Sequence, residues 1–306
     1  MSASDSPRWL SPLRYPGGKG RMGPALADIF AVQYGQLLDI EVWVEPFAGG
    51  AGAALWLLEN KHLADAWLIE RNPALAAFWA AVIDRNEELA QRVEAFTPTL
   101  AGWAWAQALV SEADMDGHPD PLDLGVAAFI LNRCSRSGMV RPGVGPIGGK
   151  LQRGRHTISD RWNGPELAER IRRLAAHTGL RVQHGDAIAA IRELSDSGVE
   201  DEVMLFVDPP YLTEGERLYQ HGSLNHKALA RALRDCPAPW LLTYDADPRV
   251  LDLYPGHRVF EYAIPHTANT RGIGREYAVL ANNLYLPEDA RELLPRAQTR
   301  WVQHSA

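Results

Sequence analysis

The stretch Met204-Leu205-Phe206-Val207-Asp208-Pro209-Pro210-Tyr211 sets four apolar residues directly before a carboxylate, two prolines and a tyrosine. A short apolar run that ends in prolines is typical of a buried strand of a parallel sheet. The prolines end such a strand, because each fixes its φ angle and lacks an N–H group. We therefore expect Asp208 at the carboxyl edge of a sheet, where open α/β folds hold their ligands. A strand stop followed by an ordinary turn is the alternative.

Similar apolar segments alternate with helical patterns along the rest of the chain. The expected strands are Glu41–Phe47, Ala66–Glu70, Arg181–His184, Val203–Val207, Trp240–Tyr244 and Glu276–Leu280, and the expected helices are Ala51–Asn60, Pro165–Thr178 and Asn225–Asp235. Strands that alternate with helices pair in parallel through right-handed crossovers. The pattern predicts an α/β fold with a doubly wound sheet.

The composition bounds the class of protein. Of 306 residues, 46% are hydrophobic and 23% are charged, which excludes a disordered, collagen-like or low-complexity chain. The two cysteines, Cys134 and Cys236, are too few for a disulfide framework, so we expect free thiols in a reducing compartment. No apolar run is long enough for a membrane span, and the polar start lacks a signal core. We expect a cytoplasmic protein with no membrane partner.

The acidic residues are unevenly distributed within a net charge of −7. Residues 125–159 contain no Asp or Glu and carry the basic residues Arg133, Arg136, Arg141, Lys150, Arg153 and Arg155. This stretch suits nucleic-acid phosphates, and a solvated basic loop is the alternative. It also interrupts the strand–helix alternation, with helical patterns followed by a long Gly/Pro/Arg-rich loop at 141–154. We therefore expect a mostly helical inserted subdomain with a basic loop.

A glycine-rich turn, Glu45-Pro46-Phe47-Ala48-Gly49-Gly50-Ala51-Gly52, joins an expected strand to an expected helix. Such glycines let the backbone approach a ligand, and a helix N-terminus favours an anionic group. The turn does not match the dinucleotide pattern, and neither Gly18-Lys19 nor Gly149-Lys150 completes a P-loop. Glu70 ends the next strand, where an acid accepts hydrogen bonds from ribose hydroxyls. These features fit S-adenosylmethionine, a nucleoside cofactor without a pyrophosphate; a tight turn beside a strand-terminal acid is the alternative.

Asp208 and Pro209 place two acceptors close together, a carboxylate and a free carbonyl oxygen. Such a pair suits one amino group, because accepting both hydrogens turns the nitrogen lone pair out of ring conjugation and toward an electrophile. Tyr211 supplies a face on which a planar base can stack. The tetrapeptide therefore predicts chemistry on the exocyclic amine of a base.

Four motifs together resemble the Dam-like (D12 class) DNA adenine-N6 methyltransferases. They are Arg14–Lys19 (RYPGGK), Val44–Gly50 (VEPFAGG), Leu131–Arg133 with Gly138 and Arg141, and Asp208–Tyr211 (DPPY), in the family's order. The resemblance covers about residues 11–283. It implies a Rossmann-like S-adenosylmethionine-dependent methyltransferase sheet with a mostly helical target-recognition insertion. The implied domains are a discontinuous catalytic domain, 1–83 and 164–289, a DNA-binding subdomain, 84–163, and a C-terminal tail, 290–306.

By the same resemblance, a methyl group passes from S-adenosylmethionine to the N6 amino group of adenine, by base flipping and direct in-line attack, leaving S-adenosylhomocysteine. The implied catalytic residues are Asp208, Pro209, Pro210 and Tyr211. The implied cofactor-binding residues are Tyr15, Gly17, Gly18, Lys19, Glu45, Pro46, Phe47, Gly49, Gly50, Gly52, Glu70, Arg71, Asn72, Asp186, Ala187 and Asp208. The implied DNA contacts are Asn132, Arg133, Arg136, Ser137, Arg141, Lys150, Arg153 and Arg155. No metal site is expected, since the histidines show no ligand spacing.

The expected partner is double-stranded DNA, bound by a monomer. A restriction endonuclease is expected only as a companion in the same system, not directly bound. Three alternatives remain open: the same pocket chemistry serves cytosine N4 or the amino group of an RNA base, and a DNA-binding relative without transfer is the third. Where the family often has aromatic and Asn residues, this chain reads Cys134-Ser135-Arg136-Ser137, so the DNA target sequence is not predicted.

Overall fold

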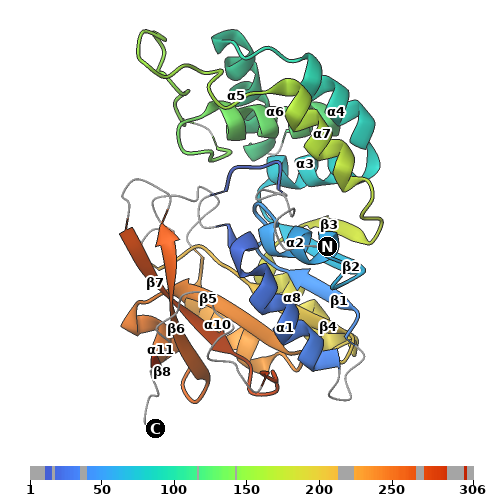
Figure 1. Cartoon of the computed structure of the whole chain (residues 1–306), viewed down its shortest axis with the longest axis vertical. Helices are drawn as coiled ribbons and strands as arrows, with labels where there is room; N and C mark the ends of the chain where they lie inside the picture. The colour runs from blue at the N-terminus through green and yellow to red at the C-terminus, as the bar shows by residue number, and fades with distance from the viewer. Residues whose placement is uncertain are drawn as a thin grey trace, which may run out of the picture. The chain divides into compact units, whose positions relative to one another are not determined.

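The computed structural model describes residues 11–15, 18–34, 40–115, 117–141, 143–212, 224–266, 272–287 and 300–301. These residues form two compact units, each assembled from several chain segments (Figure 1). The sheet unit takes the described residues of 21–48, 60–71 and 179–301. The helical unit takes those of 11–20, 49–59 and 72–178. Gly17, a predicted cofactor residue, lies outside the described residues.

The sheet unit contains a mixed sheet. Its strands are β1 (Val42–Glu45), β2 (Asp65–Glu70), β3 (Leu180–His184), β4 (Val203–Val207), β5 (Trp240–Asp245), β6 (Arg258–His266), β7 (Gly272–Leu280) and β8 (Arg300–Trp301). Within the described residues their order is β3-β2-β1-β4-β5-β7-β6-β8. The first five are parallel, and β7, β6 and β8 are each antiparallel to the strand before them. This doubly wound order reverses between β1 and β4, which makes that junction the topological switch point.

Helices connect the strands of this unit. They are α1 (Gly23–Tyr34), which follows the short 3-10 turn η1 (Lys19–Met22), and α8 (Ala187–Ser197), α10 (His226–Asp235) and α11 (Pro248–Leu253). Local signals set their ends: the Asp186 side chain caps the start of α8, and Gly198, with φ of +73°, ends it. In α10, Leu229 and Leu233 recur at the spacing of one helix face and are both fully buried.

The helical unit packs around one buried helix. Its helices are α2 (Gly52–Glu59), α3 (Pro73–Asp84), α4 (Asn86–Ala95), α5 (Leu100–Asp114), α6 (Pro121–Cys134) and α7 (Gly164–Leu174). α6 is buried from Leu124 to its end. Its Phe129 stacks on Phe78 of α3 at 5.3 Å between ring centroids. Gly125 lets the two helices approach, because a Cβ there would lie 3.0 Å from the Ala77 carbonyl oxygen.

The helical unit reaches beyond the predicted 84–163 insertion. α3 and α7, which the sequence assigned to the catalytic domain, pack against α6 and α4. Asn86 donates to the Ile171 carbonyl of α7 at 2.8 Å, and Arg172 of α7 bonds Glu87 and Glu94 of α4. α3 and α7 belong to the helical unit because other helices of that unit cover their apolar faces.

The predicted fold class, a Rossmann-like α/β sheet with a mostly helical insertion, is confirmed by the strand order and by the helical unit. The sequence did not predict the strands β6 and β8. In β8, Arg300 and Trp301 of the predicted tail pair with Glu261 and Phe260 of β6. In the described part of the chain, no helix combines the length and apolar character that crossing a membrane requires.

Candidate active site

Asp208 lies directly after β4, next to the switch point of the sheet. β4 is buried along its whole length, and Asp208, the residue after it, is partly exposed. The hydroxyl of Thr243, a fully buried residue of β5, donates to Asp208 Oδ1 at 2.7 Å. The carboxylate is therefore held by the neighbouring strand at the edge where open α/β sheets bind ligands.

The prolines of the tetrapeptide leave one carbonyl oxygen available. Pro209 is buried and Pro210 is half-buried. Among the described residues, no hydrogen bond reaches the Pro209 carbonyl oxygen. Asp208 and Pro209, neighbours in the chain, each carry an acceptor at this strand end, and their joint action on one amino group stays a prediction.

Tyr211 is fixed by a buried carboxylate. Its hydroxyl donates to Glu276 Oε1 of β7 at 2.7 Å, and the Tyr262 hydroxyl of β6 donates to Glu276 Oε2. Glu276 is only 2% exposed. Burial, reinforced by the charge of Asp208, raises the pKa of Tyr211 far above its ordinary value. The Tyr211 hydroxyl therefore stays protonated and keeps donating to Glu276.

A second tyrosine extends this aromatic cluster. The ring centroid of Tyr244 in β5 lies 6.3 Å from that of Tyr211. The Tyr244 hydroxyl lies 2.7 Å from Nδ1 of His226, the first residue of α10. Burial raises the pKa of Tyr244 well above its ordinary value, so it too is a neutral phenol. Tyr244 is fully buried and Tyr211 is partly exposed, so Tyr211 is the ring of this pair on which a planar base can pack.

Three more acids mark the carboxyl ends of the parallel strands. Glu45 is the last residue of β1 and Glu70 the last of β2, at 4% and 9% exposure, while Asp186 follows β3 by two residues. Glu45 Oε1 accepts a hydrogen bond from Trp43 at 2.9 Å. Because β3, β2, β1 and β4 are parallel, these acids share one edge of the sheet with Asp208.

Asp186 combines two roles in this arrangement. Its Oδ1 caps α8 by accepting from the backbone N–H groups of Ile188 and Ala189, at 3.0 and 3.1 Å. Its Oδ2 lies 4.0 Å from the guanidinium of Arg71, the residue after β2. Ala187, the residue after Asp186, is buried at the start of α8. The capping role is thus present, and both capping hydrogen bonds go to Oδ1.

The glycines of the turn, Gly49 to Gly52, lie in the helical unit together with the N-terminal motif, while Glu45 to Ala48 belong to the sheet unit. Gly49 has a φ of +47°, and a Cβ there would lie 2.6 Å from the Tyr15 ring; at Gly50 it would lie 2.8 Å from Tyr15 Cβ. The Gly49 carbonyl accepts from the Trp79 indole at 2.9 Å. Both positions therefore require glycine, because Tyr15 occupies the space of any side chain.

The other predicted cofactor residues of this motif are largely enclosed. Lys19 is buried at 4% exposure, so it is not a solvated surface lysine. The Gly18 N–H donates to the Tyr15 carbonyl at 3.3 Å, and a Cβ on Gly52 would lie 3.0 Å from Gly20 N. Asn72 caps α3 and donates to the Val140 carbonyl at 2.8 Å, so its side chain holds the helical unit together. In the sheet unit, Pro46 is buried and Phe47 half-buried after β1.

Two of the predicted DNA contacts are interior residues. Asn132 has no exposed surface; it accepts from Arg14 N at 2.7 Å and donates to the Arg14 and Gly138 carbonyls, each at 2.8 Å. Arg133 donates to the Pro12 carbonyl and lies over the Phe129 ring, and burial lowers its pKa to about 10. The prediction of direct DNA contact is therefore corrected for Asn132 and Arg133, because both bond the segment at 12–14.

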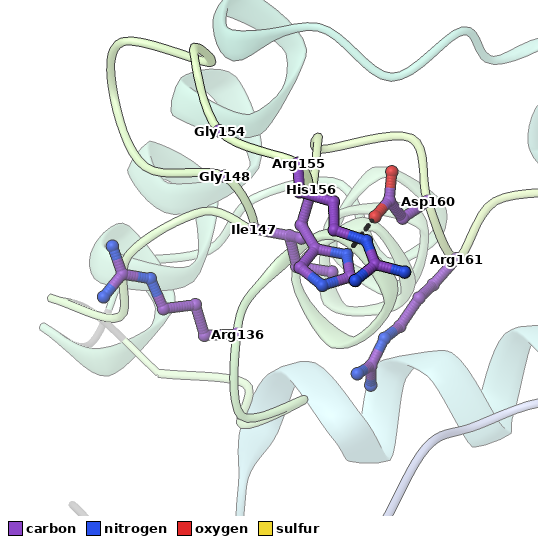
Figure 2. Close-up of a pocket in the computed structure, with 8 residues that line it drawn as sticks. All are labelled: Arg136, Ile147, Gly148, Gly154, Arg155, His156, Asp160 and Arg161. Carbon is purple, nitrogen blue, oxygen red and sulfur yellow. Dashed lines mark hydrogen bonds and ion pairs between the residues drawn. The ribbon is translucent and has the colours of Figure 1, made fainter.

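The remaining predicted contacts lie on or near the surface. Arg136, Ser137, Lys150, Arg153 and Arg155 are exposed, while Arg141 is half-buried. Arg136 and Arg155 line a hollow of about 560 Å³ together with Arg161 and His156 (Figure 2). The basic loop is therefore folded into a shaped surface. Among the described residues, no group of three or more His, Cys, Asp or Glu side chains is arranged to hold a metal ion.

Several residues of the site were not predicted from the sequence: Thr243, Tyr244, His226, Tyr262 and Glu276. One signal was available, since Glu276 places a charge at the start of an otherwise apolar strand segment. A buried acid in such a strand needs donors, and here two tyrosines supply them.

No protein-family model and no curated relative matches the chain. Solved structures with which it can be superposed include two of the rRNA methyltransferase aviRa from Streptomyces viridochromogenes. One is 17% identical over 92% of this chain and 88% of that chain, with a TM-score of 0.32. The other is 16% identical over 97% and 96%, with a TM-score of 0.34. These TM-scores are too low to carry a conclusion about this chain.

Proposed function

We propose that the chain is an S-adenosylmethionine-dependent methyltransferase that modifies the N6 amino group of adenine in DNA. The observation that carries the proposal is the pair of acceptors, Asp208 and Pro209, at the carboxyl end of β4 beside the switch point. Tyr211 next to them is held by Glu276. An amine-directing pair and a base-stacking ring together suit an exocyclic amino group.

The carboxylates along the sheet edge fit the proposed cofactor. S-adenosylmethionine carries ribose hydroxyls, an adenine amino group and an ammonium group, all of which donate hydrogen bonds. Glu70 is the acceptor suited to the ribose and Asp186 Oδ2 to the adenine amino group, and Glu45 adds negative charge. The glycine turn, Tyr15 and Lys19 stay predictions of the sequence for this role.

The chain's own residues would act by positioning and by electrostatics. When bound, S-adenosylmethionine supplies a methyl group on a positively charged sulfur and leaves as S-adenosylhomocysteine. The Asp208 carboxylate and the Pro209 carbonyl accept the two amino hydrogens, which directs the nitrogen lone pair away from the ring. The amino nitrogen takes on positive charge as it forms a bond to the methyl carbon. It then loses one proton, which passes to the Asp208 carboxylate. Negative charge fixed in advance at this point stabilises the transition state.

The choice of adenine in DNA rests on the four motifs in the family's order. The target base must leave the helical stack, because its amino group cannot be approached in line within a duplex. Cytosine N4 and the amino group of an RNA base fit the same acceptor pair, and both are outcomes that the product identifies.

The proposal is tested by the rate of methyl transfer from labelled S-adenosylmethionine to unmethylated DNA of mixed sequence. Asp208→Asn keeps an oxygen for Thr243 but removes the charge, so we expect a rate lower by at least about 10²-fold. Asp252→Asn, an exposed acid on α11, is the matched control and should transfer at the wild-type rate. Equal rates for wild type and Asp208→Asn would contradict the proposal.

A further inference from the structure

The hollow in the basic loop has the size and charge of a ligand site. Its volume of about 560 Å³ falls within the range of small-ligand pockets, roughly 300–1,000 Å³. Arg136, Arg155, His156 and Arg161 line it, and Figure 2 shows Arg155, His156 and Arg161 close together, with Arg136 set apart from them. Within the described residues none of the three arginines pairs with a carboxylate. Three guanidinium groups therefore face solvent around one cavity.

The one carboxylate of the lining is engaged by the loop itself. Asp160 accepts from the Thr157 hydroxyl at 2.7 Å, from the Thr157 N–H at 3.0 Å and from His156 Nδ1 at 2.7 Å. These hydrogen bonds, those from Thr157 first, lower the pKa of Asp160, so the group is charged. Since a charged carboxylate only accepts, His156 must donate from Nδ1. The acid thus fixes the imidazole, and the hollow keeps an excess of positive charge.

Hydrogen bonds within the loop hold its backbone in place. Gln152 donates to the Ile147 and Gly149 carbonyls at 2.7 and 2.6 Å and accepts from Ile158 N at 2.8 Å. Gly148 has a φ of +78°, and a side chain there would collide with the His156 carbonyl. A preorganised site spends less free energy on ordering when it binds. The backbone that carries Arg155 and Arg161 is thus held in one shape, while their side chains are exposed.

We propose that this hollow is a phosphate-binding subsite that takes a backbone phosphate of duplex DNA, with Arg155 and Arg161 as donors and Arg136 as a further arginine of its lining. Guanidinium groups match phosphate oxygens with paired donors, and three of them around one cavity suit an anion. The inference rests on the proposed function and deepens it. It adds Arg161 and His156 to the residues that the sequence indicated, and it makes the contact one of position and affinity, not of base sequence.

The test measures the dissociation constant of a short labelled DNA duplex by fluorescence anisotropy at several salt concentrations. The full chain is compared with Arg155→Gln and Arg161→Gln. Each should bind more weakly, and its slope of log affinity against log salt should be smaller in magnitude by about one. Arg192→Gln, an exposed arginine on α8 in the sheet unit, is the matched control and should bind like wild type. Circular dichroism melting verifies that each variant is folded.

Competition and product assays separate the remaining outcomes. Inorganic phosphate that binds in the hollow while the duplex does not displace it would overturn the DNA assignment, as would tighter binding of duplex RNA. Methyl transfer by wild type with DNA binding unchanged in both arginine variants would overturn the subsite alone. Weakened DNA binding in the variants, with no methyl transfer by wild type, would support the subsite and overturn the proposed function.

Discussion

The Tyr211 hydroxyl donates a 2.7 Å hydrogen bond to the Glu276 carboxylate, which ties the end of the Asp-Pro-Pro-Tyr tetrapeptide to β7. Tyr262 donates to the other oxygen of the same carboxylate. Each oxygen of a nearly fully buried acid thus accepts a tyrosine hydroxyl. The orientation of the Tyr211 ring is therefore set by the antiparallel half of the sheet, which makes Glu276 a positioning residue for the proposed base pocket.

Glu276→Ala should lower both stability and the rate of methyl transfer. The change leaves two buried hydroxyls without their acceptor, at a cost of about 1–3 kcal/mol each. Urea denaturation measures the loss of stability, and the kcat and KM for DNA show whether the Tyr211 ring is misplaced. Glu193→Ala, an exposed acid on α8, serves as the control. A Glu276→Ala protein as stable and as active as wild type would contradict the positioning role.

The buried tyrosines predict loss of stability at alkaline pH. Burial raises the pKa of Tyr211, Tyr244 and Tyr262 above the ordinary value, so the folded state keeps protons that the unfolded state loses. The sign follows from linkage: their contribution is complete below about pH 10 and decreases as the pH rises further. Tyrosinate absorbance followed together with circular dichroism should show these residues ionising only as the chain unfolds. Ionisation of all nine tyrosines in the folded state would contradict this.

Asp186→Asn should separate the capping role of Asp186 from its proposed role toward the cofactor. Asparagine caps helices as well as aspartate does, so the unfolding free energy should not change. The lost charge should weaken S-adenosylmethionine binding by about fivefold, since a hydrogen bond to a charged acceptor is stronger by ~1 kcal/mol. Isothermal titration calorimetry measures the affinity. Unchanged affinity in Asp186→Asn would remove Asp186 from the cofactor site.

Asn132→Ala should unfold more easily and yet bind DNA normally while folded. Three main-chain groups lose their buried partner, which costs about 3 kcal/mol in total. Chemical denaturation and duplex binding, measured on the same preparation, distinguish the two effects. Weaker DNA binding at wild-type stability would show instead that Asn132 is a contact residue.

The catalytic end of β4 could be predicted because its signals are local. Four apolar residues are followed by Asp208 and two prolines, and that order predicts both the strand and its end. β6 could not be predicted in the same way, because Arg258 and Glu261 interrupt its apolar pattern and Pro265 argues against a strand. β6 pairs with β7, and the sequence predicted only the second half of β7, Glu276–Leu280.

In the candidate site too, residues of a local motif could be predicted, and residues brought together by the fold could not. Asp208 and its neighbours follow from one short motif, but Glu276 meets Tyr211 across 65 residues of chain. That contact depends on the place of β7 beside β5, which no local pattern encodes. Asn132 and Arg133 were interpreted as DNA contacts because composition does not distinguish a buried polar residue from an exposed one. Their partners are main-chain groups 118 and 121 residues away.

The most direct test of the central claim is the identity of the methylated nucleoside. Purified protein is incubated with labelled S-adenosylmethionine and unmethylated DNA of mixed sequence, and the DNA is digested to nucleosides for mass spectrometry. The account predicts N6-methyladenine from wild type and none from Asp208→Ala. N4-methylcytosine would move the substrate while keeping the acceptor-pair mechanism. No methylated nucleoside from a protein that binds the cofactor would contradict the account.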